Sequence, residues 1–528
     1  MKMYKTRRIH KLINHIWKLS KMCERNFSIN SMKCKNEYLE YFGDKAFLHR
    51  PGENFKSKNY IITEHTNRLM KEHLLFTGGQ VRTRFPPEPN GLLHIGHAKA
   101  ININFGFAQA EQGICYLRYD DTNPEMEEET FVHGIQEMIE WLGFKAYQVT
   151  YASDYFQQLY DWAEKLIEKD LAYVCHSAPK TVKSECEDSP WRSRPIKESL
   201  HEFKAMKNKA YKEGEATLRL KMRTQQGTVD PVAYRIKYAP HHRTKEEWCI
   251  YPTYDYAHGL CDSIQNITHS LCTSEFALRR STYYWICNAL EVYCPVQTEY
   301  GRLNFLYTVV SKRKINTLIE AQVVKGWDDP RLYTLAALRR RGFPPEAINA
   351  FCRNFGLRKD NAFIHPAHLH HYVRDHLQKT ATRIMSVLKP LRVVIENFGS
   401  EDSVEVDVLN VPSDPSRGSH TATFAREVWI EETDFMESAD KRFYRLTLDQ
   451  GVGLRHTGRV ITVKEIVRNS EGGIDHLRVE STPAKDAKKP RAYIHWVANP
   501  VQLEVNMYEN LFLSERPDDP RSVPGGLL

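Results

Sequence analysis

The chain has 528 residues, of which 41% are hydrophobic and 27% charged, and its formal net charge is +8. This length can bury several cores, so about three to four domains are expected. No apolar run approaches the roughly 20 residues of a membrane-spanning helix, so no membrane partner is expected. The chain has 11 cysteines and no CxxC pair, which argues against a disulfide framework and a zinc ribbon. The positive charge fits a polyanionic partner, and solubility alone explains it equally well.

The N-terminal segment is strongly basic. Its first 23 residues carry seven lysines and arginines and no acidic residue, and apolar side chains recur at helical spacing from Ile9 to Leu19. This composition suits a mitochondrial presequence. A disordered basic arm or an RNA-binding tail explains it as well, and these two together are favoured. We therefore expect a basic extension and a cytoplasmic protein.

One stretch organises the rest of the chain. Residues 78–85 have the pattern of a short buried strand, which Pro86, Pro87 and Pro89 end because proline cannot donate to a ladder. Apolar residues then recur at helical spacing, so a helix is expected to begin near Leu93. Such a turn leaves the first helical amides unpaired, an arrangement that favours a phosphate.

Two histidines mark the beginning of that helix. His94 and His97 lie three residues apart, hence on one face. Two imidazoles can hydrogen-bond a polyphosphate and hold it more strongly as its charge is redistributed in a transition state. Gly96 between them lets a flat base or ribose approach the backbone. Taken alone, an HxxH pattern is more simply explained by histidines that pack or cap the helix.

A second stretch changes this assessment. Residues 307–315 read Tyr-Thr-Val-Val-Ser-Lys-Arg-Lys-Ile, about two hundred residues after His94-Ile95-Gly96-His97. In this order, the two stretches resemble the two signatures of class I aminoacyl-tRNA synthetases. Further stretches resemble the glutaminyl branch of that family, in its eukaryotic cytosolic form. They are residues 86–91, 120–124, 248–258, 267–276 and 302–304.

The resemblance implies an α/β Rossmann-like catalytic domain with an inserted acceptor-binding domain, an α-helical connector and C-terminal β-barrels. The implied ranges are 1–50 for the basic extension, 51–153 and 253–314 for the two catalytic halves, 154–252 for the insertion, 315–388 for the connector and 389–528 for the anticodon-binding barrels. Family members continue past the last barrel strand and carry a helical tRNA-affinity domain before the catalytic core. We expect both segments to be missing here.

The implied reaction is ATP-dependent activation of L-glutamine, followed by transfer to the 3′ adenosine of tRNA(Gln). Mg²⁺ would arrive with the ATP phosphates, and no metal held by the protein itself is expected. The residues implied to be catalytic are His94, His97 and Lys312. The lysine would reach the phosphates from a loop as a mobile positive charge and stabilise the leaving pyrophosphate. Without the resemblance, residues 311–314 are simply a solvated basic turn. The implied ATP-binding residues are Glu88, Asn90, His94, Gly96, His97, Thr273, Arg302, Leu303, Val310, Ser311 and Lys312.

A glutamine-binding set follows from the same resemblance: Arg84, Asp120, Tyr254, His258, Cys272 and Gln297. Asp120 ends a strand predicted over residues 114–119, and the carboxyl ends of parallel strands line the ligand crevice, so Asp120 can pair with the substrate ammonium. Its neighbours at 121–123 are candidate caps for the next helix. Glutamyl enzymes are the nearest rival, and their site should offer an arginine to the substrate carboxylate. Cys272 and Asn90 stand where those relatives typically have arginine and serine.

The resemblance implies contacts with tRNA for Arg383, Arg445 and Arg455, and more loosely for Lys359. The guanidinium groups of the arginines suit this task, because they stack on unpaired bases and hydrogen-bond their edges. The implied partners are tRNA(Gln), L-glutamine, ATP and a multi-synthetase complex. A second kind of function is a synthetase-like RNA-binding protein without aminoacylation activity. The expected missing end favours it, and the retained catalytic positions argue against it.

Overall fold

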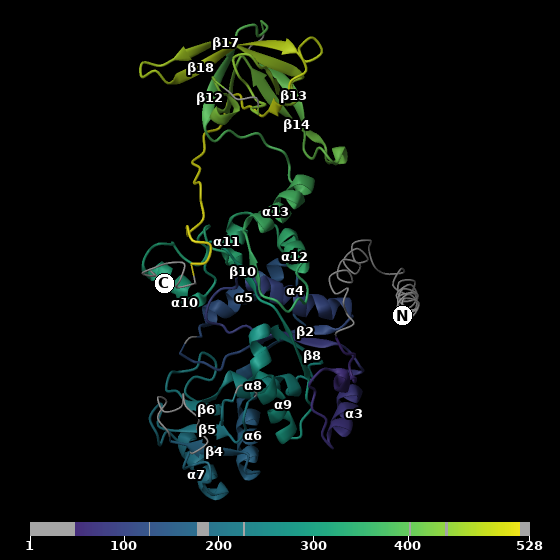
Figure 1. The fold of residues 1–528 in the computed structure, drawn as a ribbon, viewed down its shortest axis with the longest axis vertical. Helices are drawn as coiled ribbons and strands as arrows, with labels where there is room; N and C mark the ends of the chain where they lie inside the picture. The colour runs from purple at the N-terminus through teal and green to yellow at the C-terminus, as the bar shows by residue number, and fades with distance from the viewer. Residues whose placement is uncertain are drawn as a thin grey trace, which may run out of the picture. The chain divides into compact units, whose positions relative to one another are not determined.

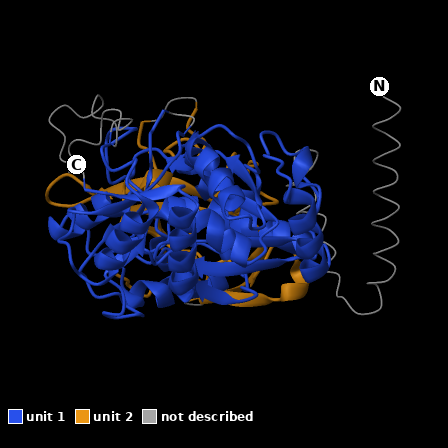
Figure 2. Ribbon diagram, turned by 90° about the horizontal axis from the view of Figure 1, so that it is seen from below, with its two compact units in different colours: residues 1–372, 510–528 blue, residues 373–509 orange. Residues whose placement is uncertain are grey.

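The computed structural model describes residues 48–125, 127–176, 189–224, 227–400, 403–438 and 442–517 (Figure 1). The expected basic extension therefore lies outside the described residues, except for its last three. The chain forms two compact units, Met1–Tyr372 with Asn510–Leu528, and Val373–Glu509 (Figure 2). Within the described ranges, no helix combines the length and apolar character that a membrane span requires.

The first unit contains a parallel sheet that carries the organising stretch. Strands β1, β2 and β3 pair in that order, and β8 pairs with β9, also in parallel. The two sets meet where the backbone N–H of Thr268 donates to the Arg82 carbonyl at 2.9 Å. These strands are β1 (Arg82–Phe85), β2 (Ile114–Tyr119), β3 (Val149–Tyr151), β8 (His269–Thr273) and β9 (Val296–Tyr300).

The predicted succession of strand, turn and helix is confirmed, but the strand β1 begins at Arg82 and not at Gly78, which ends α3 at positive φ. Helix α4 (Ile95–Ala110) packs against β1, β2 and β8. Its apolar positions Ile95, Ala98, Ile101 and Phe105 are buried, because they recur at helical spacing toward the sheet. The other helices of this region, including the short 3-10 helices, are α3 (Thr66–Thr77), α5 (Glu129–Trp141), α8 (Tyr254–Ile264), α9 (Arg280–Ala289), η2 (Asn54–Lys56), η3 (Ala152–Tyr155) and η6 (Ser274–Arg279).

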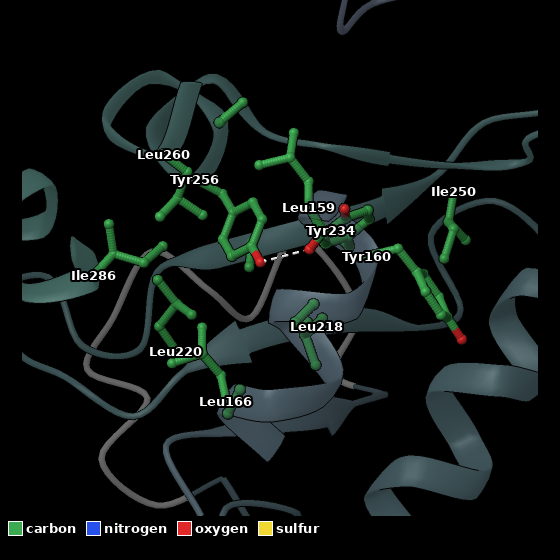
Figure 3. Packing of buried hydrophobic residues seen from close by; sticks show 14 of the residues in the cluster. Leu159, Tyr160, Leu166, Leu218, Leu220, Tyr234, Ile250, Tyr256, Leu260 and Ile286 are labelled. Atoms are coloured by element: carbon green, nitrogen blue, oxygen red, sulfur yellow. Dashed lines mark hydrogen bonds between the residues drawn. The ribbon is translucent and has the colours of Figure 1, made fainter. Parts of the chain in front are cut away.

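An insertion separates the two halves of this sheet in the sequence. Its described residues form an antiparallel sheet of order β4-β5-β6-β7 with the helices α6 and α7. Leu159 and Leu218 from the insertion pack in one core with Tyr256 of α8, whose hydroxyl donates to the Leu159 carbonyl at 2.7 Å (Figure 3). This shared core fixes the insertion against the second half of the divided catalytic region, to which α8 belongs. Its elements are α6 (Phe156–Glu168), β4 (Ala172–Cys175), α7 (Ile196–Lys207), β5 (Thr217–Leu220), β6 (Val232–Ile236) and β7 (Ile250–Pro252).

Helices dominate the segment that follows β9, as the sequence predicts. Two short strands of this segment, β10 and β11, pair in parallel, with Leu303 opposite Ala362. The elements are β10 (Leu303–Phe305), α10 (Lys312–Glu320), α11 (Leu335–Arg340), α12 (Pro345–Arg353), β11 (Ala362–Ile364) and α13 (Ala367–Thr380).

The second unit contains a six-stranded sheet of order β15-β12-β18-β17-β16-β19. Its ends approach each other, since Trp429 and Val497 exchange two backbone hydrogen bonds of 2.8 and 2.9 Å, so the sheet is a nearly closed barrel. The predicted α/β and β-barrel architecture is thus confirmed. The strands are β12 (Pro390–Ile395), β15 (Glu427–Glu431), β16 (Val452–Leu454), β17 (Arg459–Arg468), β18 (Ile474–Pro483) and β19 (Tyr493–Ile494), with a separate hairpin of β13 (Ser403–Leu409) and β14 (Ser419–Ala425).

One strand prediction in this unit is wrong. The apolar pattern over residues 452–466 predicts a single strand, but the chain forms the antiparallel pair β16 and β17. His456 and Gly458 adopt positive φ values of 68° and 66° and turn the chain between them. Glycine is the default residue at positive φ and histidine is enriched there among the other residues, so His456 and Gly458 are the turn signal that the apolar pattern concealed.

Candidate active site

The two signature histidines complete the N-terminus of α4. His94 precedes the helix in extended conformation, and its Nδ1 accepts a hydrogen bond from the Gly96 backbone at 3.0 Å. His97 Nδ1 accepts one from the His94 backbone at 3.1 Å, and the two ring centroids lie 3.9 Å apart. Because each Nδ1 is an acceptor, both rings carry their proton on Nε2. Each Nε2–H is the ring donor that remains for a ligand.

Both imidazoles are neutral at physiological pH. Burial lowers the pKa of His94 to about 3, and the charges of Lys312 and Arg302 act in the same direction. Burial also holds the pKa of His97 well below its ordinary value, with His94 and the same two cations adding to the effect. The histidines can therefore offer hydrogen bonds to a polyphosphate, while its charge must be met by Lys312 and Arg302.

The prediction of unpaired helix amides is wrong. The Ile95 amide donates to the Tyr333 carbonyl at 3.0 Å, and the Gly96 amide donates to the His94 ring. The His97 amide donates to the His94 carbonyl at 2.8 Å. A phosphate at this site would therefore meet imidazole donors in place of backbone amides. The alternative that the histidines cap the helix is confirmed, and it leaves their Nε2 atoms available.

Gly96 is required by the His94 ring. A Cβ atom on Gly96 would lie 2.8 Å from His94 Cε1 and 3.3 Å from the Leu303 carbonyl oxygen. Real Cβ contacts are not this short, so only glycine lets the ring fold back over the first turn of α4. The same contact places Leu303, an expected ATP-binding residue, beside the histidines.

Lys312 is the first residue of α10, so the prediction that it lies on a loop is wrong. The helix begins there because Ser311, at its N-cap, is extended. Lys312 Nζ donates to the Glu88 carbonyl at 3.0 Å and contacts Asn90 Oδ1. Burial lowers the pKa of Lys312 to about 8, against the opposing effect of the Glu88 carboxylate. The second signature is thereby bound to the turn that precedes the first.

Two further expected ATP residues, Thr273 and Arg302, lie at the ends of β8 and β9. Thr273 ends β8, and Glu275 just beyond it forms an ion pair with Arg302. Lys99 from α4 donates to the Gly301 carbonyl at 2.6 Å and so fixes the turn that carries Arg302. The structure therefore joins this turn both to α4 and to the end of β8.

On the other side of β1, Arg84 is fully buried. Its Nε donates to Asp262 Oδ1 and its Nη1 to the Leu271 carbonyl, both at 2.9 Å. Its Nη2 donates to Ser270 Oγ at 2.9 Å and lies 2.6 Å from His258 Nε2. Because arginine only donates, His258 accepts at Nε2. Burial lowers the pKa of His258 to about 3, so this ring is also neutral.

Asp262 organises this network, although it was not among the residues predicted from the sequence. Besides Arg84, it accepts from Arg118 Nη2 at 2.5 Å and from Ser270 Oγ at 2.7 Å. Burial alone would raise its pKa, but the two arginines hold it well below the ordinary range. The available signal was its position one turn after His258 in a helical segment, which places both side chains on one face.

Asp120 lies directly after β2, at the predicted edge of the sheet. Its Oδ1 accepts a hydrogen bond from Thr122 Oγ1 at 2.9 Å. Burial, and next the Glu88 carboxylate, raise the pKa of Asp120 to about 7. A carboxyl group in this environment is stabilised as an anion by an adjacent ammonium group, which suits the expected role.

The alternative of a cap at residues 121–123 is wrong. Helix α5 begins at Glu129, and its N-cap is Glu128, which makes no side-chain capping bond. Residues 121–123 therefore lie too far upstream to cap it. Asp121 instead binds Ser153, accepting from its backbone N–H at 2.9 Å and from its hydroxyl at 2.6 Å.

Gln297 has a defined side-chain orientation. Its Nε2 donates to the Phe276 carbonyl and to Glu299 Oε1, both at 2.8 Å. Its Oε1 is buried without a hydrogen-bond partner among the described residues. Arg280 Nε in turn donates to Glu299 Oε1 at 2.9 Å. Gln297 Oε1 is therefore an acceptor without a partner among the described residues, since the donors of this side chain are already used.

The other expected glutamine residues surround this point. The ring of Tyr254 stacks against His258 with centroids 4.9 Å apart, and Phe276 lies 5.2 Å from Tyr254. Cys272 is buried at the end of β8, and burial raises the pKa of its thiol, which stays neutral. A neutral thiol thus stands where an arginine was expected in a glutamate site.

The expected tRNA contacts have different environments. Lys359 is exposed in the first unit. Arg383 Nη2 donates to the Gln378 carbonyl at 2.7 Å, at the end of α13, and Arg445 Nη1 lies 3.1 Å from Asp434 Oδ1. Arg455 is exposed in the turn between β16 and β17.

A parallel sheet divided by an insertion, a helix capped by two histidines and a lysine from a second signature together define a class I aminoacyl-tRNA synthetase. Residues 80–379 match the family model "tRNA synthetases class I (E and Q), catalytic domain", and residues 381–482 match the anti-codon binding domain of the same group. The chain therefore belongs to the class I tRNA synthetases of the E and Q type.

Its curated relatives are named for glutamine. The chain is 57% identical to a probable glutamine–tRNA ligase of Drosophila melanogaster, over 93% of this chain and 63% of that protein. It is 56% identical to the glutamine–tRNA ligase of Bos taurus, over 92% and 63%. It is 45% identical to a cytoplasmic glutamine–tRNA ligase of Arabidopsis thaliana, over 88% and 60%. The chain thus spans about 63% of the length of the first two relatives.

A third family match corrects the expectations for the N-terminal segment. Residues 19–71 match the model for the second portion of the non-specific RNA binding region of glutaminyl-tRNA synthetase. The prediction that the tRNA-affinity region before the catalytic core is missing is therefore wrong for this portion. The alternative of a mitochondrial presequence is not borne out, and the match supports the RNA-binding alternative from residue 19 onward.

Proposed function

We propose that this chain carries the catalytic and anticodon-recognising domains of a glutamine–tRNA ligase. It would activate L-glutamine with ATP to glutaminyl adenylate and transfer the glutaminyl group to the 3′ adenosine of tRNA(Gln). The observation that carries the choice of amino acid is the orientation of Gln297. Its free Oε1 can accept a hydrogen bond from the side-chain amide of glutamine, whereas it would face a glutamate carboxylate with an unfavourable lone pair.

The amino acid would be oriented by two further groups. The Asp120 carboxylate would pair with the substrate ammonium, beside the buried network of Arg84 and His258. Tyr254 and Cys272 would enclose the side chain without offering a positive charge to it. This arrangement favours a neutral amide over a carboxylate, because an unpaired buried charge is strongly unfavourable.

The ATP phosphates would lie beside His94 and His97, whose Nε2–H groups donate hydrogen bonds. Lys312 and Arg302 would supply positive charge as pyrophosphate leaves. Mg²⁺, bound to the phosphates, would offset their charge further. The glutamine carboxylate attacks the α-phosphate, and the 2′-hydroxyl of the terminal adenosine then attacks the adenylate. Positioning and electrostatics would carry the rate, and no side chain is assigned as general base.

Three expectations remain proposals. The cytoplasmic location is supported by the name of the Arabidopsis relative. Contacts of Lys359, Arg383, Arg445 and Arg455 with tRNA are supported by the match to the anti-codon binding domain. Membership of a multi-synthetase complex rests on the resemblance alone.

The deciding experiment is charging of purified tRNA with labelled glutamine or labelled glutamate, on glutamine and glutamate acceptors. tRNA should be present during activation, because enzymes of this type generally form the adenylate only with tRNA bound. We expect glutamine to be attached to its own acceptor. Charging with glutamate would overturn the assignment of Gln297 and Cys272. Binding of tRNA without any charging would instead support an RNA-binding protein without catalytic activity.

A further inference from the structure

Lys99 is a buried lysine of α4 to which the proposed reaction assigns no role. The residue is only 2% exposed, and it lies one turn after Gly96 on the same face of the helix. Lysine is almost never buried to this extent unless a partner compensates its charge. Its burial therefore calls for a specific interaction.

No carboxylate pairs with Lys99 within the described ranges. The ionisable groups that act on it are the Cys352 thiol of α12 and the Arg358 guanidinium. Burial raises the pKa of that thiol to about 12, so it is neutral. Burial lowers the pKa of Lys99 to about 8, so most of the side chain is protonated at physiological pH. The ammonium lies 5.5 Å from the ring centroid of Tyr300, a favourable contact for a cation.

The ammonium group is directed at the backbone of the turn that leads into β10. Lys99 Nζ donates to the Gly301 carbonyl at 2.6 Å, and this is its one side-chain hydrogen bond with the described residues. An ammonium group could donate three. Hydrogen bonds from ionised donors are shorter than neutral ones and about twice as strong. The charge of Lys99 thus strengthens a single backbone contact.

The same face of α4 also meets the residue two positions further on. A Cβ atom on Gly96 would lie 3.3 Å from the Leu303 carbonyl oxygen, so this carbonyl lies against the helix as well. The Arg302 carbonyl between them faces away from α4, since it accepts from the Ala362 amide of β11 at 2.9 Å. Arg302 is therefore placed by contacts of its two neighbours with α4.

The turn is bound to the segment before β11 through its other backbone groups. The Gly301 amide donates to the Arg358 carbonyl at 2.7 Å, and the Arg302 amide donates to Asn361 Oδ1 at 2.8 Å. A Cβ atom on Gly301 would lie 2.0 Å from the Asp360 carbonyl oxygen, so the two backbones are in direct contact. The turn and this segment thus move as one piece, and Lys99 joins that piece to the helix of the signature histidines.

We propose that Lys99 is a positioning residue for the nucleotide: through the Gly301 carbonyl, its ammonium sets the position of Arg302 relative to His94 and His97. This inference rests on the proposed function, in which Arg302 and the two histidines contact the ATP phosphates. In the structure, Arg302 forms an exposed ion pair with Glu275, with which the phosphates would compete. A turn anchored at Gly301 keeps the guanidinium directed at the phosphates when that ion pair opens.

The test compares Lys99→Met with the wild type, both as the full chain. Equilibrium dialysis with labelled ATP, Mg²⁺ and tRNA gives the Kd for ATP, and charging assays give the KM for glutamine. We expect the Kd for ATP to rise about tenfold, because a charge-assisted hydrogen bond is lost. The KM for glutamine and the melting temperature should stay nearly unchanged, since methionine also removes a buried charge that has no carboxylate partner. Lys145→Met, at an exposed position between α5 and β3, is the matched control.

A double-mutant cycle separates positioning from a general structural role. Because Lys99 acts through Arg302, Lys99→Met should change the Kd for ATP less than twofold in an Arg302→Gln background. Lys99→Gln, whose side chain is one atom shorter than lysine, should show the same loss and replaces the methionine variant if that variant fails to fold. An unchanged Kd for ATP, or equal factors in both backgrounds, would overturn the proposal. Wild-type protein that binds no ATP would overturn the proposed function and this inference together.

Discussion

Glu299 fixes the orientation of the Gln297 amide, whose Nε2 donates to it at 2.8 Å. Replacing Glu299 with glutamine removes this constraint, because the new amide can donate as well as accept. The Gln297 amide is then free to turn and present its donors to the substrate. We expect Glu299→Gln to lower the preference for glutamine over glutamate about tenfold, which corresponds to about 1.4 kcal/mol.

The preference is measured as the ratio of kcat/KM values for the two amino acids, which cancels any loss of active protein. Glu168→Gln, an exposed position on α6, is the matched control and should leave the ratio unchanged. An unchanged ratio in Glu299→Gln would show that the orientation of Gln297 does not select the substrate.

Lys312 is expected to act on the phosphates rather than on the stability of the fold. Lys312→Met should lower the rate of ATP–pyrophosphate exchange about 100-fold, since it removes a positive charge close to the leaving group. The buried ammonium has a lowered pKa, so its loss should not lower the melting temperature. Arg313→Gln, at the next and exposed position of α10, is the control. A large fall in melting temperature would indicate a structural role instead.

The elements that position the site could largely be predicted from the sequence. The prolines after β1 and the apolar spacing of α4 specify a strand, a turn and a helix within one local stretch. The site residues followed from motifs, and the structure brings His94 beside His97 and Lys312 beside Glu88 and Asn90. The motifs indicate which residues form the site, but not which of their atoms donate or accept hydrogen bonds.

The partners of these side chains could not be predicted, because they depend on contacts between distant segments of the chain. Arg84 binds Asp262, 178 residues away, and no local pattern pairs them. The amide of Ile95 is occupied by the Tyr333 carbonyl, so a rule that holds for an isolated helix end fails here. The basic run around Lys312 resembles a solvated turn, although the lysine itself reaches inward to the Glu88 carbonyl.

Ionisation of Asp120 should lower the free energy of unfolding at high pH. Its pKa is about 7 in the folded protein, above its ordinary value of 3.8. The folded state thus binds this proton more tightly, so stability is lost as pH rises from about 4 through 7. Asp120→Asn removes the ionisation and should raise the free energy of unfolding by about 2 kcal/mol at pH 8, and by less at pH 5. Activation of glutamine should be lost, because the ammonium loses its counter-charge.

Urea denaturation at the two pH values, followed by fluorescence, measures this effect. Asp161→Asn, which alters an exposed carboxylate on α6, is the control. An equal stability change at pH 5 and pH 8 would mean that ionisation of Asp120 is not its cause.

Gly96→Ala tests whether the His94 ring needs the space above residue 96. The new Cβ would lie 2.8 Å from His94 Cε1, so the ring or the Leu303 backbone must move. We expect a loss of about 1 to 3 kcal/mol in stability, typical of overpacking, and a clear rise in KM for ATP. Gly399→Ala is the control, because a Cβ there meets nothing within 4 Å. In a His94→Ala background the clash with the ring is absent, so Gly96→Ala should cost markedly less stability there. Equal costs in both backgrounds would show that the Leu303 carbonyl, and not the His94 ring, requires glycine at this position.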